Sequence, residues 1–308
     1  MKYRRLGRTG MKVSVVGIGT WQFGGEWGKD FAQAEVDAIL GRAAELGVNL
    51  VDTAECYGDH FSEKLVGRAI KSDRDRWIVA TKFGHRFTGL FAREDIYAPD
   101  GVQRQLEDSL RALRTDRIDL YQFHSGSDDL FDTEGLWEML AGQVKAGKIR
   151  HLGISITSKP KSTHQIDTAT QVGAGAVQVV YNRLARSPEE HVFKVCMEQN
   201  IGVLARVPLA SGFLSGKYDK KARFNANDVR ATWKDPAERE ALIDQIEQIR
   251  PEVPEGVPMA QWALAWCLQH PAVTCVIPGC KTVEQAESNV AGASLDMVRD
   301  DHPQAVRV

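Results

Sequence analysis

The chain carries little net charge, few cysteines and no long apolar run. A net charge of −2 over 308 residues gives no electrostatic drive toward nucleic acid or anionic membranes. The five cysteines are odd in number and form no Cys-x-x-Cys pair, which favours reduced thiols over a disulfide framework. The N-terminal segment lacks the apolar core of a signal peptide, and no run approaches membrane-spanning length. We therefore expect a cytoplasmic protein with no nucleic-acid and no membrane partner.

Two common nucleotide-binding motifs are also missing. Residues 17–22 read GIGTWQ and lack the third glycine of a Gly-x-Gly-x-x-Gly sequence, which argues against a Rossmann site. No Walker A sequence occurs either. Because both motifs are missing, a nucleotide site would have to belong to another fold. Hydrophobic and charged contents of 43% and 26% are ordinary for a globular protein.

Apolar runs alternate with amphipathic stretches along the whole chain. We expect strands at residues 13–19, 48–53, 76–82, 117–124, 150–156, 175–181, 201–207 and 272–278. We expect helices at residues 32–47, 102–116, 134–148, 189–200 and 259–271. Eight parallel strands with right-handed helical crossovers predict an α/β fold, a (β/α)8 TIM barrel forming a single domain over residues 1–308.

Two segments stand outside this alternation. Residues around Gly7-Arg8-Thr9-Gly10 predict an N-terminal β-hairpin, in position to plug the bottom of the barrel. The stretch from Ala210 to Asp235 is long for a connection in a compact domain and follows the seventh expected strand. Such a segment is typical of a functional lid over the upper face.

Four polar residues of complementary chemistry lie at the ends of three of these runs. Asp52 and Tyr57 belong to NLVDTAECYG (49–58), Lys82 to WIVATKFG (77–84) and His124 to IDLYQFHS (118–125). A tyrosine is a poor acid at neutral pH, but a nearby ammonium stabilises the phenolate and an aspartate keeps that ammonium charged. A histidine can orient the oxygen that receives the proton. Since active sites of such barrels lie at the carboxyl ends of the strands, the pattern indicates an enzyme that donates a proton to a carbonyl.

The last expected strand leads into IPGCKTVEQAESN (277–289). A glycine turn followed by Lys281, Thr282 and a helix start is typical of a phosphate cradle, because helix N-termini attract anions. The same letters also describe a helix capped by Thr282 with solvated polar residues, and the two interpretations remain open on these residues alone.

These runs together resemble the aldo-keto reductases. The resemblance rests on GIGTWQFGG (17–25), VDTAECYG (51–58), TKFG (81–84), DLYQFH (119–124), LGIS (152–155), PLASGFLSGKY (208–218) and the 277–289 segment. It covers essentially the whole chain in order, and is greatest to the bacterial general-stress and sugar-related branch. It implies an NADPH-dependent (NADP⁺-forming) reductase acting on a small-molecule carbonyl or alcohol, with Asp52, Tyr57, Lys82 and His124 as catalytic residues and Tyr57 as the general acid.

The resemblance also implies a set of cofactor-binding residues. Ser155 and Gln178 match positions that hold the nicotinamide carboxamide, and Thr20, Trp21, Asp52 and Arg206 complete that end of the site. Matches to the pyrophosphate loop are Pro208, Leu209, Ser211, Gly212, Lys217 and Arg223. Matches to the contacts with the adenosine and its 2′-phosphate are Gly279, Lys281, Gln285, Ser288 and Asn289. No metal ligand is implied.

Three positions depart from the family pattern. Ile156 stands where an asparagine is frequent and removes one carboxamide contact. Arg206 replaces a stacking aromatic, although a planar guanidinium can also stack. Ser288 replaces a common glutamate at the adenosine end. These departures bear on affinity more than on the type of reaction.

Two other functions remain open. The first is a nucleotide-binding regulatory subunit that keeps this barrel, similar to the potassium-channel β subunits. The second is a lyase that forms a Schiff base through Lys82, which would require a neutral lysine.

Overall fold

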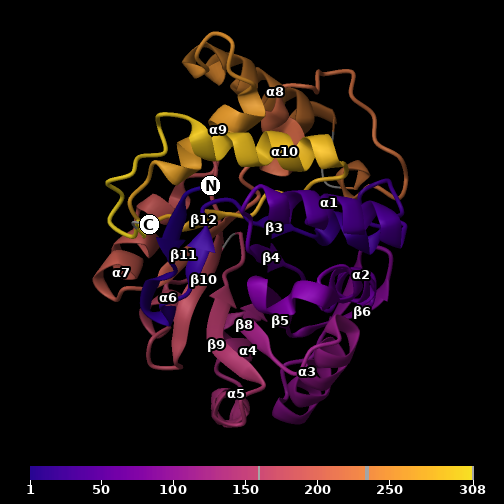
Figure 1. Ribbon diagram of the computed structural model, residues 1–308, viewed down its shortest axis with the longest axis vertical. Coiled ribbons are helices and arrows are strands. Elements are labelled where there is room, and N and C mark those ends of the chain that lie inside the picture. The colour runs from indigo at the N-terminus through magenta and orange to yellow at the C-terminus, as the bar shows by residue number, and fades with distance from the viewer. Residues whose placement is uncertain (159, 233–235, 307–308) are drawn as a thin grey trace.

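The computed structural model describes residues 1–158, 160–232 and 236–306, and its centre is a parallel sheet of eight strands. The strands are β3 (Ile18–Gly19), β4 (Leu50–Asp52), β5 (Ile78–Phe83), β8 (Ile118–His124), β9 (Ile149–Ser155), β10 (Ala174–Val180), β11 (Gly202–Arg206) and β12 (Cys275–Val276). They follow one another in the order β3-β4-β5-β8-β9-β10-β11-β12. Parallel bridges Val16–Val276 and Gly19–Gly279 join the last strand to the first. The predicted barrel is confirmed, and Figure 1 shows its strands at the centre with helices outside them.

An antiparallel hairpin of β1 (Tyr3–Arg5) and β2 (Lys12–Ser14) precedes the barrel, as predicted. Its side chains Leu6 and Val13 are fully buried in one apolar cluster with inward residues of the strands, such as Leu50 and Leu204. The hairpin therefore fills the lower end of the barrel. Its tip approaches β11 so closely that a Cβ on Gly202 would lie 2.5 Å from Leu6 Cδ1.

The boundaries of the first and last expected strands were wrong. The run 13–19 divides between two sheets, because residues 12–14 pair with β1, and only Ile18–Gly19 form regular strand in the barrel, with Val16 adding a single bridge to Val276. The run 272–278 contributes only Cys275–Val276 as regular strand. Apolar letters alone do not separate a hairpin strand from a barrel strand when both are buried on one side.

Helices surround the barrel and pack on it through a second, larger apolar cluster. They are α1 (Gln33–Glu45), α2 (Phe61–Ala69), α3 (Pro99–Leu113), α4 (Asp128–Phe131), α5 (Leu136–Lys145), α6 (His164–Asp167), α7 (Val192–Glu198), α8 (Pro236–Ile249), α9 (Met259–Leu268) and α10 (Val283–Ala291). On α1, which was predicted as residues 32–47, Val36, Ile39, Leu40 and Ala43 are buried and belong to this cluster. The helices α2 and α8 were not predicted.

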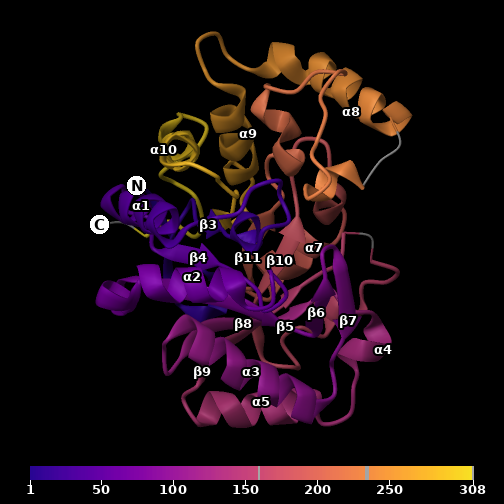
Figure 2. The ribbon, with the colours of Figure 1, turned by 90° about the vertical axis from the view of Figure 1, so that its right-hand side faces the viewer.

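The helix α8 lies at the opposite end of the molecule from α3 and α5 in both views (Figures 1 and 2). Its residues Ile243 and Ile246 pack against Phe213 of the segment that follows β11, and against Trp262 of α9. The segment expected as a lid thus has its own small core. Part of that segment, residues 233–235, lies outside the described residues.

A second hairpin, β6 (His85–Gly89) with β7 (Ala92–Asp95), follows β5 and was not predicted. Its burial alternates between intermediate and exposed residues, so it lacks the apolar run by which the barrel strands were found. Arg93 of β7 reaches back to the buried carboxylate of Glu26. None of the described helices is long and apolar enough to cross a membrane.

Candidate active site

Three neighbouring strands place the predicted catalytic residues at one end of the barrel. Asp52 ends β4 and His124 ends β8, while Lys82 lies one residue before the end of β5. The strand order β4-β5-β8 makes these positions adjacent. Tyr57 follows β4 in a turn that returns its ring to the same place, so the structure brings all four residues together.

Two glycines permit the position of Tyr57. The backbone of residues 57–58 lies directly on Gly24, where a Cβ would be 2.7 Å from the carbonyl carbon of Tyr57. Gly58 itself has φ +67°, a conformation that favours glycine. The ring of Tyr57 then stacks on Trp21, with centroids 6.0 Å apart and planes 20° apart.

The ammonium of Lys82 is the centre of the polar contacts. Its Nζ donates to Asp52 Oδ2 at 2.8 Å, to the Thr53 carbonyl at 2.7 Å and to Tyr57 Oη at 3.4 Å. Lys82 is fully buried and Asp52 is 3% exposed. Gln178 Nε2 donates to the other carboxylate oxygen of Asp52 at 2.7 Å. The lysine charge is thus balanced by one carboxylate and directed at one phenol.

Burial and charge act in opposite directions on this pair. Burial lowers the pKa of Lys82. Asp52 and Tyr57 raise it by more than burial lowers it, so that the pKa lies above the ordinary value of a lysine. Lys82 therefore stays charged, which argues against a Schiff-base lyase. Burial raises the pKa of Tyr57 to about 12, although Lys82 lowers it. The expected effect of Lys82 is present, but burial outweighs it.

His124 is a neutral side chain in this setting. Burial, followed by the neighbouring His85 and Lys82, holds its pKa well below the ordinary value. Its ring stands at 82° to that of Tyr57, with centroids 6.2 Å apart. The hydroxyl of Tyr97 donates to its backbone carbonyl at 2.8 Å. A neutral imidazole fixed in this way can hydrogen-bond a substrate oxygen.

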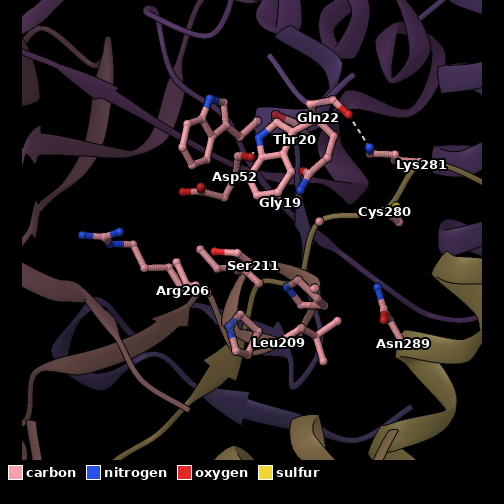
Figure 3. Close-up of a pocket in the computed structure, with 18 of the residues that line it drawn as sticks. Gly19, Thr20, Gln22, Asp52, Arg206, Leu209, Ser211, Cys280, Lys281 and Asn289 are labelled. Atoms are coloured by element: carbon pink, nitrogen blue, oxygen red, sulfur yellow. Dashed lines mark hydrogen bonds between the residues drawn. The ribbon is translucent and has the colours of Figure 1, made fainter. Parts of the chain in front are cut away.

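A cavity of about 510 Å³ opens over these residues. Predicted residues that line it are Thr20, Trp21, Asp52, Tyr57, His124, Gln178, Arg206, Pro208, Leu209, Ser211, Gly212, Lys217, Gly279, Lys281, Gln285, Ser288 and Asn289. Figure 3 shows Asp52 and Arg206 at one end of the group and Lys281 and Asn289 at the other. The cavity is thus long enough to connect the proposed catalytic residues with the segment after β12.

Positive charge gathers at the end where Lys281 lies. Burial is the main cause that lowers the pKa of Lys281. The nearby positive charges of Arg230, Lys217 and Lys29 lower the pKa as well, whereas the carboxylate of Asp228 raises it. Thr282 caps α10 by accepting from the Gln285 N–H at 3.2 Å. A cationic cluster beside a capped helix N-terminus suits phosphate groups.

Buried polar atoms at the cavity (Asn289) and next to it (Ser155) also fit a nucleotide. Asn289 Nδ2 and Ser155 Oγ are buried and find no hydrogen-bond partner among the described residues. Gly279 leaves room for the amide of Gln22 at the cavity, because a Cβ there would lie 2.0 Å from Gln22 Oε1. Buried polar groups without partners are rare and invite a ligand, so these residues fit a dinucleotide cofactor.

Three predicted residues do not line the cavity. Lys82 lies beneath it, Ser155 lies behind it, and Arg223 is exposed, with its guanidinium bonded to the carbonyls of Lys221 and Ala222. In the stretch that contains Arg223, the arginine that lines the cavity is Arg230, which is paired with Asp228 at 2.6 Å.

Arg230 belongs to the same basic stretch as Arg223, but spacing alone did not show which arginine turns inward. The sequence also missed Trp27 and Arg93 as lining residues. Trp27 forms an isolated bridge with Asp228, and Val229 N–H donates to the Glu26 carbonyl at 2.8 Å. The loop after β3 is thereby tied to the segment after β11, a pairing between distant residues that no local pattern predicts.

A closed (β/α)8 barrel with a buried Asp-Lys-Tyr contact and a nucleotide-sized cavity defines a class of barrel oxidoreductases. The Aldo/keto reductase family profile matches residues 15–307. The chain therefore belongs to the aldo/keto reductase family, and it is an oxidoreductase acting on carbonyls and alcohols. Enzymes of this family use nicotinamide cofactors.

Individual relatives agree with this assignment. Aldo-keto reductase YhdN of Bacillus subtilis is 31% identical over 309 residues, which cover 96% of this chain and 90% of the relative. The holo form of aldo-keto reductase AKR11C1 from Bacillus halodurans has a TM-score of 0.80 at 28% identity, covering 96% of this chain and 91% of that chain. Glycerol dehydrogenase AKR11B4 from Gluconobacter oxydans has a TM-score of 0.78 at 26% identity, covering 100% and 98%.

Proposed function

We propose that this chain reduces aldehydes or ketones to alcohols with NADPH, and that Tyr57 is the general acid. One observation carries the proposal: the buried Lys82 ammonium contacts both the Asp52 carboxylate and the Tyr57 hydroxyl at the floor of the cavity. In this proposal residues 1–308 act as one barrel domain, because the site draws on segments from β3 to α10.

The proton is supplied by Tyr57. With its pKa raised by burial to about 12, the phenol is protonated at neutral pH. It releases its proton to the carbonyl oxygen only as that oxygen gains negative charge, because an alkoxide is a stronger base than a phenolate. Lys82 stabilises the phenolate left behind, and Asp52 holds Lys82 charged and in place.

His124 orients the reacting oxygen. As a neutral imidazole at the cavity wall, it hydrogen-bonds the carbonyl oxygen next to Tyr57 without competing as the acid. Trp21, stacked on Tyr57, limits the access of water to the phenol. A bound nicotinamide supplies the hydride that the carbonyl carbon receives.

The cationic cluster favours NADPH over NADH. The 2′-phosphate adds charge that only a basic site rewards, and Lys281 lies among Arg230, Lys217 and Lys29. Ser155, Gln178 and Arg206 would hold the nicotinamide end, and Asn289 and Gln285 the adenosine end.

A panel of aldehydes and ketones, assayed separately with NADPH and with NADH by loss of nicotinamide absorbance, tests this function. We expect carbonyl-dependent oxidation, faster at low cofactor concentration with NADPH. Tight nucleotide binding with no turnover of any carbonyl or alcohol would contradict the proposal and favour a regulatory subunit.

A further inference from the structure

Glu55 and Cys56, which have no role in the mechanism above, form a cluster of three potential metal ligands with the proposed catalytic residue His124. The ligand atoms of Glu55, Cys56 and His124 all lie within 4.8 Å of one another. Cys56 Sγ is 3.8 Å from His124 Nδ1. The same nitrogen is 3.8 Å from Glu55 Oε1.

These separations are close to those of a tetrahedral zinc site. Bonds of about 2.3 Å to sulfur and about 2.0–2.1 Å to nitrogen or oxygen place neighbouring ligand atoms roughly 3.3–3.6 Å apart. The atoms now 3.8 Å apart would need to approach by a few tenths of an ångström, and a pair at the 4.8 Å limit by about 1 Å. A thiolate, an imidazole and a carboxylate also suit a borderline-soft cation better than magnesium or calcium, which prefer oxygen ligands.

Glu55 supplies the independent sign that something is missing from this cluster. It is 2% exposed, and its Oε1 accepts from the His85 N–H at 3.0 Å. Its Oε2 is buried and has no hydrogen-bond partner among the described residues. A buried carboxyl oxygen without a partner is costly, and coordination of a cation would satisfy it.

The cluster is accessible from the cavity. Cys56 and His124 both line the cavity, so a fourth coordination position would open toward it. Two of the cationic side chains that act on His124 are paired with carboxylates, Lys82 with Asp52 at 2.8 Å and Arg93 with Glu26. A third, Arg206, donates to the Ile156 carbonyl at 3.0 Å. The described cysteines are all free thiols.

We propose that Glu55, Cys56 and His124 form a binding site for a divalent cation of the zinc class, open to the substrate cavity. Its occupation fixes His124 through Nδ1 and places a cation at the cavity beside Tyr57, so that the metal acts as a reversible inhibitor. The binding site stands without the proposed function, whereas the inhibition rests on it.

Cobalt(II) added to the purified protein without cofactor is the first test, because a thiolate bound to cobalt gives its own charge-transfer absorption. We expect one equivalent to bind with that absorption and to be displaced by zinc. Cys56→Ser should abolish the thiolate band, and both Cys56→Ser and Glu55→Gln should weaken cobalt binding by at least about tenfold.

Cys280→Ser is the matched control, since Cys280 is also a buried thiol that lines the cavity but lies outside the cluster. It should bind cobalt as the parent does. Circular dichroism and the melting temperature confirm that each variant is folded. A parent with no thiolate band, or a Cys280→Ser variant that loses as much affinity as Cys56→Ser, would overturn the site.

Steady-state reduction with added zinc tests the inhibition. We expect zinc to compete with the carbonyl, and Cys56→Ser to tolerate at least about ten times more zinc. Full activity of the metal-loaded parent would overturn the inhibitory role. Cobalt binding with the thiolate band in a protein that reduces no carbonyl would contradict the proposed function and leave the site intact.

Discussion

At the scale of single residues, the proposed chemistry depends on the buried charge pair of Lys82 and Asp52. The pair holds an ammonium next to the hydroxyl of Tyr57. Lys82 and Asp52 contact each other at 2.8 Å with 1% and 4% of their side chains exposed. Such a pair contributes little to stability in itself, but the loss of one partner leaves an uncompensated buried charge. Its retention in the core is therefore better explained by chemistry than by folding.

This view predicts a non-additive pair of substitutions. Lys82→Met should lower the free energy of unfolding by about 3–5 kcal/mol, because Asp52 is left alone. The double variant Asp52→Asn, Lys82→Met should regain most of that stability, measured by urea denaturation, while remaining inactive. Equal instability of the single and double variants would show that the pair is chiefly a packing element.

Cofactor choice is predicted at the same scale. Lys281→Ala should weaken NADPH binding by about 1–3 kcal/mol, the value of a charge-assisted hydrogen bond, and should change NADH binding little. Lys217→Ala is the comparison, since a lysine that serves the pyrophosphate affects both cofactors alike. Fluorescence titration of both variants with NADPH and with NADH gives the four changes in dissociation constant. Equal losses of NADPH and NADH affinity in Lys281→Ala would refute the role of Lys281 at the 2′-phosphate.

At the scale of elements, close packing at glycines fixes how the hairpin and the barrel fit. Gly202 begins β11 and meets the side chain of Leu6, which the β1–β2 hairpin inserts into the barrel. The contact leaves no room for a methyl group. The hairpin is therefore part of the core and not an appendage.

Gly202→Ala should accordingly destabilise the protein by about 1–3 kcal/mol through overpacking. A Cβ added to Gly142, inside α5, would meet no atom within 4 Å, and Gly142→Ala should stabilise by about 0.5–1 kcal/mol through helix propensity. Thermal unfolding of both variants gives the sign of each change in stability. An unchanged stability of Gly202→Ala would show that the hairpin shifts to make room for the added methyl group.

The elements that the sequence predicted are those with a continuous apolar signal. The barrel strands and α1 carry such a signal, and the grouping of Asp52, Lys82 and His124 follows from adjacent parallel strands. The β6–β7 hairpin does not carry it, because its residues are intermediate or exposed. The helix α8 was not predicted although Ile243, Ile246 and Ile249 are buried, because polar residues separate them. The inward turn of Arg230 rather than Arg223 depends on the contact of residues 227–229 with 26–28, which is tertiary and has no local signature.

At the scale of the whole molecule, the C-terminal segment secures the lower end of the barrel, away from the cavity. Arg5 N–H donates to the Gln304 carbonyl at 2.7 Å, and Arg4 pairs with Ala305 in an isolated bridge. His302 is 8% exposed, and its Nδ1 accepts from the Gln304 N–H at 3.1 Å. Burial, and then the charge of Arg4, lower the pKa of His302 to about 4.

The lowered pKa makes stability depend on pH. An unfolded histidine binds a proton near pH 6.5 and the folded His302 only near pH 4, so the unfolded state binds more protons between these values. His302 therefore contributes a loss of stability as pH falls through that window, ~1–3 kcal/mol between pH 7 and pH 5. Because burial also lowers the pKa of His124, His302→Asn should reduce the total acid loss by about the share of His302, measured by urea denaturation at both pH values.

His164 is the control for that experiment. It is half-buried, and its hydrogen bond to Asp132 raises its pKa, so it favours the folded state at low pH. His164→Asn should leave the acid loss in place. An unchanged loss in His302→Asn would place the acid-sensitive group elsewhere.

In the proposed function Tyr57 delivers the proton, and removal of its hydroxyl oxygen is the most direct test of that role. Tyr57→Phe should lower kcat for carbonyl reduction by at least ~100-fold, the scale of lost general-acid catalysis, and leave the dissociation constant of NADPH nearly unchanged. Tyr3→Phe removes the same atom from a hydroxyl that donates to the Gly47 carbonyl, away from the cavity, and should keep full turnover. A Tyr57→Phe enzyme that retains most of the parent kcat would contradict the account.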